Sequence, residues 1–329
     1  MKRRTCLIVA SLFALALSLG FGPTPARAAE APRELRIGYQ KIGALLILKQ
    51  RGSLEKRLAG ENITVRWVQF QSGPPLIEAL NAGAIDFGYT GDTPPIVAQA
   101  SGVDFVYVAS IPQPGASNAI LVRNDANIHS LADLRGKKVA LVKGSSAHNV
   151  LVQVLKKANV GWSDVTPVYL QPADAGAALR SGSVDAWSIW DPFYALGERF
   201  PGVHVLTTAQ GVAPSNAFFL ATRSFATRYP AVVTAIVDET TAAWHWAEHH
   251  QAELAAVLAD ASGVPVDVEK VVAARGNYEI AFVTPQVVRQ QQAIADTFSE
   301  LGLIPHPIVI GQAVWTPGSS LTATREVRK

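Results

Sequence analysis

A short stretch with a glycine and two serines, Val142-Lys-Gly-Ser-Ser-Ala-His-Asn149, offers the simplest binding chemistry in the sequence. A predicted strand ends within it, and a predicted helix begins at Ser145 or Ser146. The first N–H groups of a helix have no partner within the helix, and this end carries partial positive charge. It can therefore bind an anion without a cationic side chain. The serines are equally suited to cap the helix, so a purely structural role stays open.

Two further junctions place an aspartate where a predicted strand gives way to a helix. They are Tyr89-Thr-Gly-Asp-Thr-Pro-Pro95 and Trp190-Asp-Pro-Phe193. An aspartate just before a proline is typical of a helix N-cap, so capping is the first interpretation of Asp92 and Asp191. Capping leaves other N–H groups free, so these helix ends can also bind a ligand. Trp190, at a strand end, is predicted to line a pocket, whereas Trp187 is predicted to lie in the core.

Motifs for enzymatic chemistry are mostly missing from the sequence. It contains no GxGxxG, GxxxxGK[ST], GxSxG or CxxC pattern, and Ser53-Leu-Glu-Lys56 matches SxxK without its companion motifs. His245-Trp-Ala-Glu-His249 matches HxxEH, in which two histidines on one helix face can share a metal. Its alanine-rich surroundings favour an ordinary surface helix. The sequence therefore predicts a protein that is not an enzyme and has no metal site and no cofactor.

Alternating strand-like and helical stretches must position these junctions. This alternation predicts parallel sheets in an α/β fold, with a ligand cleft at the carboxyl ends of the strands. Strands are predicted at residues 35–39, 63–70, 85–89, 105–108, 119–122, 138–142, 165–170, 184–189 and 218–221. Beyond residue 224 the pattern is helical, at 230–259, 266–275 and 285–301.

An internal repeat links the two halves of this pattern. Leu80-Asn-Ala-Gly-Ala-Ile-Asp86 recurs as Leu179-Arg-Ser-Gly-Ser-Val-Asp185, and the same offset carries Asp92 onto Asp191. Near the start of each copy, Arg36-Ile-Gly-Tyr-Gln-Lys41 lies 102 residues before Lys138-Val-Ala-Leu-Val-Lys143. The repeat predicts two similar α/β lobes that face each other, with a ligand between them.

The amino terminus has the features of an export signal. Lys2, Arg3 and Arg4 precede an uncharged, mostly apolar run at 6–19, and Ala26-Arg-Ala28 supplies small residues at a cleavage site. The run is shorter than the roughly 18–20 residues that span a bilayer. We predict a signal peptide at residues 1–28, cleaved after Ala28.

Removal of that peptide changes the composition of the protein. The full chain has 29 basic and 26 acidic residues and a formal charge of +3, whereas residues 29–329 have 25 basic and 26 acidic residues. No basic cluster remains, which argues against nucleic-acid binding. Both sulfur-containing residues, Met1 and Cys6, leave with the peptide. The predicted product is an exported, soluble protein without disulfides, and its length favours two lobes.

These motifs together resemble the aliphatic sulfonate-binding proteins of ABC importers. The resemblance rests on Leu35-Arg-Ile-Gly-Tyr-Gln-Lys41, the junctions at 89–95 and 143–149, Val184-Asp-Ala-Trp-Ser-Ile-Trp-Asp-Pro192 and Ala295-Asp-Thr-Phe298. It covers residues 35–315 and implies a type II periplasmic binding-protein fold with two α/β lobes, a two-stranded hinge and a ligand cleft. The expected organisation is lobe 1 at 29–120 plus 217–315, lobe 2 at 121–216 and a polar tail at 316–329.

The resemblance also implies which residues bind the ligand. From lobe 1 they are Gln40, Thr90, Gly91 and Asp92; from lobe 2 they are Gly144, Ser145, Ser146, His148, Trp190 and Asp191; Asn216 and Arg275 are further candidates. The chain departs from the family after Lys41, where Ile42-Gly43-Ala44 replaces a common Gly-Ser pair and removes a hydroxyl. The tail of the ligand is expected along Trp190 and Tyr39.

The function implied is capture of an alkanesulfonate in the periplasm for import. The partners implied are an inner-membrane ABC permease with its cytoplasmic ATPase, and the binding protein is expected to be a monomer. Taurine, sulfate esters, nitrate or a thiamine-precursor pyrimidine are alternative ligands, and a free carboxylate at Asp92 or Asp191 would favour taurine. A pyrimidine-forming enzyme of the same fold, using Lys143 and His148, is the alternative of another class.

Overall fold

The computed structural model describes residues 31–113, 115–212 and 215–317 as a mixed α/β protein. The predicted signal peptide at 1–28, and all but the first two residues of the predicted tail, lie outside the described residues. Within the described part of the chain, no helix combines the length and apolar character that crossing a membrane requires.

The first sheet has six strands in the order β11-β4-β10-β3-β1-β2. Its strands are β1 (Glu34–Gln40), β2 (Thr64–Phe70), β3 (Phe87–Thr90), β4 (Phe105–Gln113), β10 (Ser215–Thr222) and β11 (Ala281–Phe282). β1 pairs with β2 and β3 in parallel, whereas β10 is antiparallel to both β3 and β4. The late strand β10 thus returns to the centre of a sheet that the first third of the chain begins.

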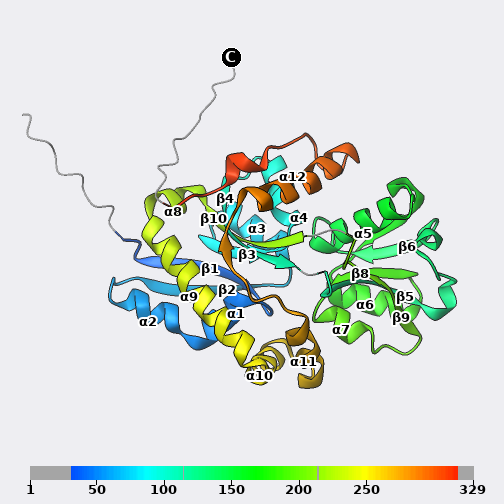
Figure 1. The fold of residues 1–329 in the computed structure, drawn as a ribbon, viewed down its shortest axis with the longest axis horizontal. Coiled ribbons are helices and arrows are strands. Elements are labelled where there is room, and N and C mark those ends of the chain that lie inside the picture. The colour runs from blue at the N-terminus through cyan, green and yellow to red at the C-terminus, as the bar shows by residue number, and fades with distance from the viewer. Residues whose placement is uncertain (1–30, 114, 213–214, 318–329) are drawn as a thin grey trace, which may run out of the picture. The chain divides into compact units, whose positions relative to one another are not determined.

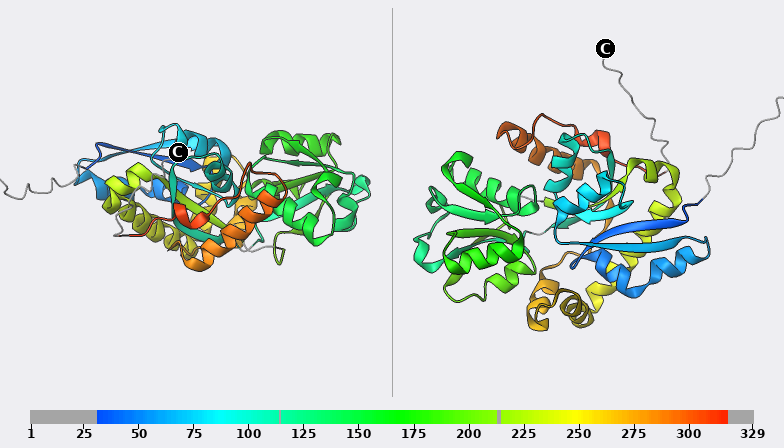
Figure 2. Two further views of the ribbon diagram at one scale, coloured as in Figure 1. Left: turned by 90° about the horizontal axis from the view of Figure 1, so that it is seen from above. Right: turned by 180° about the vertical axis from the view of Figure 1, so that it is seen from behind.

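The second sheet has five strands in the order β7-β6-β8-β5-β9. Its strands are β5 (Asn118–Arg123), β6 (Lys138–Leu141), β7 (Thr166–Tyr169), β8 (Ala186–Trp190) and β9 (Val203–Thr208). β6 pairs in parallel with β7 and β8, and β5 is antiparallel to β8 and β9. The chain passes between the sheets twice, after β4 and before β10 (Figures 1 and 2).

Helices cover both faces of each sheet (Figure 1). Around the first sheet lie α1 (Ala44–Arg51), α2 (Ser53–Ala59), α3 (Gly73–Asn81), α4 (Thr93–Ala100), α8 (Arg223–Arg228), α9 (Pro230–His249), α10 (Gln251–Ser262), α11 (Val266–Arg275) and α12 (Pro285–Glu300). Around the second lie α5 (Ser146–Lys157), α6 (Pro172–Ser181) and α7 (Phe193–Gly197). Short 3₁₀ helices occupy Asn124–Ala126, Leu131–Leu134, Trp162–Asp164 and Ile310–Ala313.

Alternation along the strands divides each lobe into two apolar layers. In β10, Phe219 packs with α1 and α9, whereas Phe218 and Leu220 pack with α3, α4 and α12. In the second sheet Leu141 packs with α5, and Ala140 packs with α6. Because both faces are buried, the strands are nearly continuous apolar runs, and this made them recognisable in the sequence.

The internal repeat has a structural cause in both lobes. Asp86 accepts the backbone N–H of Arg36 at 2.9 Å, and Asp185 accepts that of Lys138 at 2.8 Å. Each aspartate follows a glycine with positive φ at a helix end, Gly83 at 67° and Gly182 at 78°. The repeated residues therefore end a helix and anchor the start of a neighbouring strand, β1 in one lobe and β6 in the other.

Several expectations need correction. Both sheets are mixed and not purely parallel, because β5 and β10 run against their neighbours. Two strands are not predicted from the sequence, namely β9, whose residues are all half-buried, and the two-residue β11. The expected helix at 230–259 is two helices, α9 and α10, separated at His250.

Candidate functional site

A cavity of about 150 Å³ lies between the two sheets and is lined from both. From the first lobe the lining residues are Gln40, Ile42, Gly43, Gly73, Tyr89, Gly91, Pro94, Ile111, Gln113, Ser215, Ala217, Trp244, Leu254, Leu258, Val272, Ala273, Arg275, Gly276, Asn277 and Tyr278. Ser117, at the crossing into the second lobe, also lines it, with Asn118, Ser145, Ser146, Trp190 and Asp191 of that lobe. The cavity therefore lies at the strand ends, where the sequence predicted a cleft.

The start of α5 brings two of the predicted residues to the cavity. Gly144 has φ +69°, a left-handed conformation that suits glycine, and it turns the chain from β6 into the helix. The Ser145 hydroxyl donates to the carbonyl of Val142 at 2.7 Å and makes no side-chain cap. The first amides of α5 therefore keep their donor capacity. The Ser145 side chain therefore does not cap α5, which excludes the purely structural role considered for it above.

Gly91 brings the first lobe against this helix end. A Cβ atom built on Gly91 would lie 1.8 Å from Oγ of Ser146 and 3.2 Å from its Cβ. Any side chain at this position would require the Ser146 side chain to move, so Gly91 allows the two lobes to approach closely here. Gly91 and Ser146 both line the cavity, so they close it at one point.

Two helix starts that the sequence analysis did not select also reach the cavity. α1 follows Gly43, which has φ +84°, and α3 begins at Gly73, where a Cβ would lie 2.6 Å from Cγ of Pro94. Both glycines line the cavity. The sequence held a usable pattern at the second position, since Ser72-Gly-Pro-Pro75 follows a strand much as Asp92-Thr-Pro-Pro95 does.

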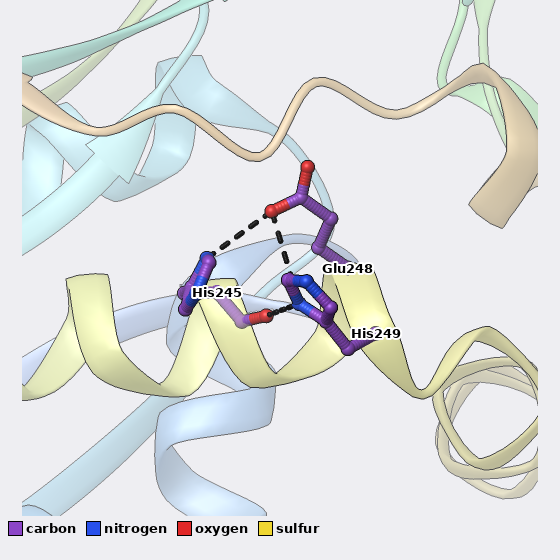
Figure 3. Close-up of side chains that lie close together, drawn as sticks. All are labelled: His245, Glu248 and His249. Carbon is purple, nitrogen blue, oxygen red and sulfur yellow. Dashed lines mark hydrogen bonds and ion pairs between the residues drawn. The ribbon is translucent and has the colours of Figure 1, made fainter.

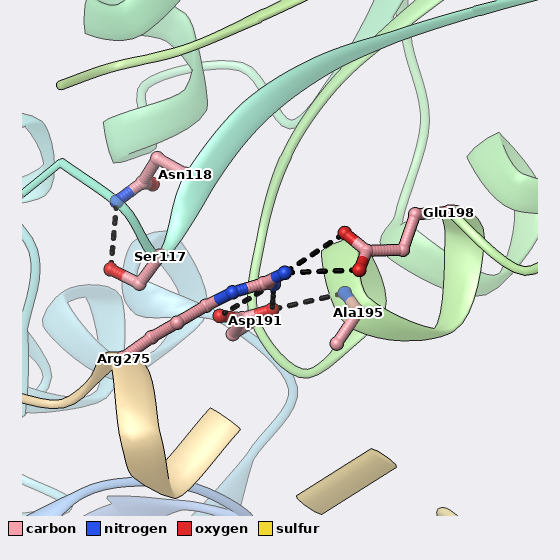
Figure 4. A network of polar contacts seen from close by, with 6 residues as sticks. All are labelled: Ser117, Asn118, Asp191, Ala195, Glu198 and Arg275. Atoms are coloured by element: carbon pink, nitrogen blue, oxygen red, sulfur yellow. Dashed lines mark hydrogen bonds and ion pairs between the residues drawn. The ribbon is translucent and has the colours of Figure 1, made fainter. Parts of the chain in front are cut away.

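An ionic network around the buried Asp191 includes two residues of the cavity lining, Asp191 and Arg275 (Figure 4). Nη1 of Arg275, at the end of α11, lies 3.2 and 3.4 Å from the carboxylate oxygens of Asp191, and Nη2 lies 3.0 Å from both oxygens of Glu198. Asp191 also accepts the backbone N–H of Ala195 at 2.9 Å, which supports its predicted role as a cap for α7. The guanidinium lies 4.1 Å from the ring centroid of Tyr194. Among the described lining residues Arg275 is the only Lys, Arg or His, and two carboxylates neutralise it.

Burial dominates the electrostatics of this network. It raises the pKa of Asp191 to about 7, although Arg275 and the Ala195 amide favour the ionised form. The same loss of solvent acts to lower the pKa of Arg275, but Asp191 and Glu198 outweigh it and hold that pKa above its ordinary value. Asp191 therefore titrates near neutrality while Arg275 stays charged.

Asn118 is a further polar residue that the sequence analysis missed. Its side chain is 5% exposed and lines the cavity. Its Nδ2 lies 3.4 Å from Oγ of Ser117, and its Oδ1 is buried without a hydrogen-bond partner (Figure 4). A buried amide with spare hydrogen-bonding capacity is suited to a polar ligand.

The cavity brings together seven predicted site residues, namely Gln40, Gly91, Ser145, Ser146, Trp190, Asp191 and Arg275. It does not include Thr90, Asp92, Gly144, His148 or Asn216. Thr90 is fully buried and donates to the carbonyl of Gly91, and Asn216 donates to Gln290 at 3.0 Å. Tyr39, expected beside the ligand tail, also lies outside the lining and stacks edge-on against Trp67.

Asp92 joins the lobes behind the cavity. Its carboxylate accepts from the Thr93 hydroxyl and from Nδ2 of Asn149, both at 2.8 Å, and it makes no side-chain cap to α4. Burial raises the pKa of Asp92 to about 6, against the effect of these donors. One carboxylate oxygen is thus engaged by Thr93 of the same lobe and the other by Asn149 of α5 in the second lobe.

His148 is also directed away from the cavity. Its Nδ1 accepts the backbone N–H of Gly144 at 3.2 Å, and its ring packs against Trp162 and Phe298. Burial, followed by the charge of Lys143, lowers the pKa of His148 to about 4. The imidazole is therefore neutral at ordinary pH and fixes the turn before α5.

The HxxEH residues form a cluster on the surface of α9 (Figure 3). Potential ligand atoms of His245, Glu248 and His249 lie within 4.8 Å of one another, and all three residues are exposed. Nδ1 of His245 lies 3.1 Å from the Glu248 carboxylate, and Nδ1 of His249 lies 2.9 Å from the carbonyl of His245. None of the three lines the cavity.

Comparison with a solved structure defines the class of protein. The alkanesulfonate-binding protein SsuA from Xanthomonas axonopodis pv. citri, bound to MOPS, superposes with a TM-score of 0.83 at 39% identity, covering 86% of this chain and 98% of that chain. Two mixed α/β lobes with a cavity between them are thus a type II periplasmic binding-protein fold, as the sequence predicted.

Sequence comparisons then identify the family. The profile described as NMT1/THI5 like matches residues 58–285. A protein of Escherichia coli (strain K12) named for binding aliphatic sulfonates is 40% identical over 307 residues, 92% of this chain and 95% of that protein. The taurine-binding periplasmic protein of the same organism is 30% identical over 264 residues, 74% of this chain and 79% of that protein. The chain belongs to the NMT1/THI5-like family and groups with its aliphatic sulfonate-binding proteins.

Proposed function

We propose that this protein captures an organic sulfonate between its lobes as the solute-binding component of an ABC importer. The observation that carries the proposal is the start of α5, with Ser145 and Ser146, facing Gly91 in a cavity where the one cationic residue of the described lining, Arg275, is neutralised. A sulfonate is anionic at ordinary pH and has only acceptor oxygens, which matches the backbone amide donors at the start of α5. The relatives named for sulfonate binding support this assignment.

The lining favours a sulfonate with an organic part over a small inorganic anion. Besides the polar helix starts, it includes Ile111, Leu254, Leu258 and Val272. Nitrate and sulfate have no apolar surface to place against these side chains, so burying them would gain nothing from the hydrophobic effect.

The carboxylates argue against taurine. Taurine carries an ammonium group, and such a group needs a free carboxylate when it is buried. Asp92 is engaged by Thr93 and Asn149 and lies outside the cavity lining, and Asp191 is engaged by Arg275 and the Ala195 amide. Taurine would have to displace one of these partners.

A role in pyrimidine-forming catalysis has less support. That reaction was expected to use Lys143 and His148, and neither lines the cavity. The depressed pKa and buried packing of His148 favour a structural role. We infer that the protein binds and releases its ligand unchanged.

The ligand contacts that we propose come from both lobes. They are the predicted Gln40, Gly91, Ser145, Ser146, Trp190, Asp191 and Arg275, with Gly43, Gly73 and Asn118 added. A ligand that bridges the lobes would favour the closed arrangement by its differential affinity. Lobe 2 is proposed at 121–216 and lobe 1 at 29–120 plus 217–315, although β5 of the second sheet already begins at Asn118 and β10 of the first sheet at Ser215.

The same proposal covers the cellular setting. The protein would be exported, cleaved after Ala28 and act as a monomer in the periplasm. Its closed, loaded form would dock on an inner-membrane permease driven by a cytoplasmic ATPase. Amino-terminal sequencing of the secreted protein tests the cleavage, since any other first residue than Ala29 contradicts it.

A ligand panel tests the binding function directly. Calorimetry and thermal shift would compare ethanesulfonate, hexanesulfonate, MOPS, taurine, sulfate, nitrate and hydroxymethylpyrimidine. We expect saturable binding and a raised melting temperature with the sulfonates. Stabilisation by nitrate or the pyrimidine without any sulfonate response would overturn the proposal.

A further inference from the structure

The last turn of α9 carries three residues of metal-binding type on one exposed face (Figure 3). His245, Glu248 and His249, which we call the α9 cluster, are three and four residues apart, so their side chains are neighbours on the helix surface. Within the part of the chain that the structure describes, no other His, Cys, Asp or Glu residues form such a group of three. The sequence favoured an ordinary surface helix here, but the structure brings the three side chains together.

Exposure leaves these side chains free to adjust around an ion. The side chains of His245, Glu248 and His249 are 70%, 48% and 59% exposed. Donor atoms bound to one tetrahedral Zn²⁺ lie about 3.3 Å apart, because each is about 2 Å from the metal. Nδ1 of His245 and a carboxylate oxygen of Glu248 are already 3.1 Å apart. Rotation of the exposed His249 side chain would bring a third donor to the same centre.

The hydrogen bond of His249 prepares its ring for a metal. Its Nδ1 lies 2.9 Å from the backbone carbonyl of His245. A carbonyl oxygen can only accept, so Nδ1 carries the proton in this contact and Nε2 keeps its lone pair. Metal-bound histidines typically donate their second ring N–H to a carbonyl or carboxylate in this way, which fixes the tautomer and the ring orientation. Nε2 of His249 is thus the donor atom available to an ion.

The position of the cluster in the helix also favours a cation. α9 has 20 residues and ends at His249. The final carbonyl groups of a helix have no partner within it and carry partial negative charge, which stabilises a cation near this end. The exposed Glu279 lines the same surface groove as His245 and Glu248 and adds a second carboxylate. A divalent cation bound here would therefore lie in a region of negative potential.

The donor set indicates which metals would bind. Two imidazole nitrogens and one carboxylate oxygen suit Zn²⁺, Ni²⁺ and Cu²⁺, whereas Mg²⁺ and Ca²⁺ prefer sites made of oxygen atoms. Three protein ligands leave a tetrahedral ion one open position, which water would occupy. The cluster should therefore bind Cu²⁺ more tightly than Ni²⁺ and Zn²⁺ and discriminate against Mg²⁺.

We propose that His245, Glu248 and His249 form a surface binding site for a divalent transition-metal ion such as Zn²⁺. The proposal does not depend on sulfonate capture, because none of these three residues lines the cavity. A bound ion would join residues 245 and 249 across one helical turn and stabilise the end of α9. The melting temperature should then rise with metal concentration once that concentration exceeds the dissociation constant.

Calorimetry with ZnCl2 tests the proposal on the exported protein without an affinity tag, since a polyhistidine tag would bind the metal. Wild type should bind one Zn²⁺, and MgCl2 should give no saturable heat. His245→Gln, Glu248→Gln and His249→Gln should each weaken Zn²⁺ binding by more than about tenfold, because even an outer hydrogen-bond partner of a ligand contributes about 10- to 100-fold. All three side chains are exposed, so the melting temperature without metal should stay at the wild-type value.

His250→Gln is the matched control for these variants. His250 follows the cluster directly, and its Nδ1 lies 2.8 Å from the carbonyl of Trp246, a contact of the same kind as that of His249. Its ring stacks on Trp246 at a centroid distance of 4.5 Å, and it does not belong to the group of three. His306→Gln, at an exposed histidine outside α9, is a second control. Both should bind Zn²⁺ as wild type does.

X-ray absorption at the zinc edge gives a readout that does not depend on the variants. The wild-type complex should show two imidazole nitrogens bound directly to the metal. A spectrum with fewer imidazoles, or no saturable Zn²⁺ binding in wild type, overturns the proposal. Affinity that persists in His245→Gln and His249→Gln also overturns it, as does an equal loss of affinity in both control variants.

Discussion

The two lobes contact each other on two sides of the cavity, and different forces hold each side. On the α4–α5 side, Gly91 lies against Ser146, and Asp92 accepts a hydrogen bond from Asn149. On the α7–α11 side, Arg275 bridges Asp191 and Glu198, and Arg199 pairs with Asp267 at 2.6 Å. The first side depends on close packing and short hydrogen bonds; the second depends on charge.

This difference separates two requirements of a protein that closes on a ligand. Steric contact fixes how closely the lobes approach, because the repulsive overlap energy rises steeply as the distance between atoms shrinks. Ion pairs act over longer distances and respond to pH and salt, especially where they are exposed. We therefore expect the α4–α5 side to define the closed geometry and the α7–α11 side to adjust how stable that geometry is.

Gly91→Ala should have the largest effect, because its Cβ would overlap the Ser146 hydroxyl. Displacing packed groups costs about 1–3 kcal/mol, so ligand affinity should fall roughly 10- to 100-fold while the ligand-free protein stays folded. Calorimetry with hexanesulfonate measures the loss.

Gly311→Ala is the matched control for that experiment, since a Cβ there meets no atom within 4 Å. Adding Ser146→Gly to Gly91→Ala should restore part of the affinity by removing the overlapped side chain. Unchanged binding in Gly91→Ala would show that the lobes do not need this close approach.

Asn149→Ala should mainly affect stability. It removes a 2.8 Å hydrogen bond to the buried Asp92 carboxylate, and loss of a partner for such a group costs about 1–3 kcal/mol. The pKa of Asp92 is about 6, so the destabilisation should be larger at pH 8, where the group is charged, than at pH 5. Urea denaturation at both pH values tests this, with Lys157→Gln, an exposed position on the same helix, as control. A loss independent of pH would contradict it.

Asp191→Asn should flatten the pH dependence of stability. The pKa of Asp191 is raised to about 7, so between about pH 4 and 7 the folded protein holds a proton that the unfolded chain releases. This group alone therefore lowers the free energy of unfolding as pH rises, by up to about 1.4 kcal/mol per pH unit, and the loss is complete above the folded pKa.

Denaturation curves for the ligand-free protein from pH 4.5 to 7.5 measure that slope. The control is Asp174→Asn, which changes an exposed aspartate of α6. If Asp191→Asn retains the wild-type slope, Asp191 is ionised throughout this range.

Arg199→Ala should have the smallest effect. Arg199 and Asp267 are largely exposed, so water and salt weaken their attraction. Affinity for hexanesulfonate and the melting temperature should both stay at wild-type values at 0.15 M salt. A clear loss of affinity would show that the exposed pair contributes to closure as much as the buried one.

Much of the fold was predictable because local patterns carry it. Strands buried on both faces appear as apolar runs, and the helices at 266–275 and 285–301 were found to within a residue. The half-buried β9 and the short β11 lack such runs. Strand direction was harder to predict from the sequence. β10 runs antiparallel to its neighbours because the chain returns from the second lobe before forming it.

The sequence predicted cavity-lining residues where a suitable residue type stands at a strand end or a helix start. Ser145, Ser146, Gly91 and Trp190 lie at strand ends, and all four line the cavity. Asp92 and His148 lie at equally suitable sequence positions but are directed away from the cavity lining. Their neighbours in space, Asn149 and Phe298, are on α5 and on the distant α12.

The sequence alone determined that two related α/β lobes carry glycine and serine at helix starts, because periodicity and turn chemistry are local. Only the tertiary structure decided that Asp191 and Glu198 neutralise the charge of Arg275. It also decided that α9, α10 and α11 contribute apolar side chains to the cavity lining. The reason is physical: charge pairing and burial depend on which distant segments meet, and spacing along the chain does not specify that contact.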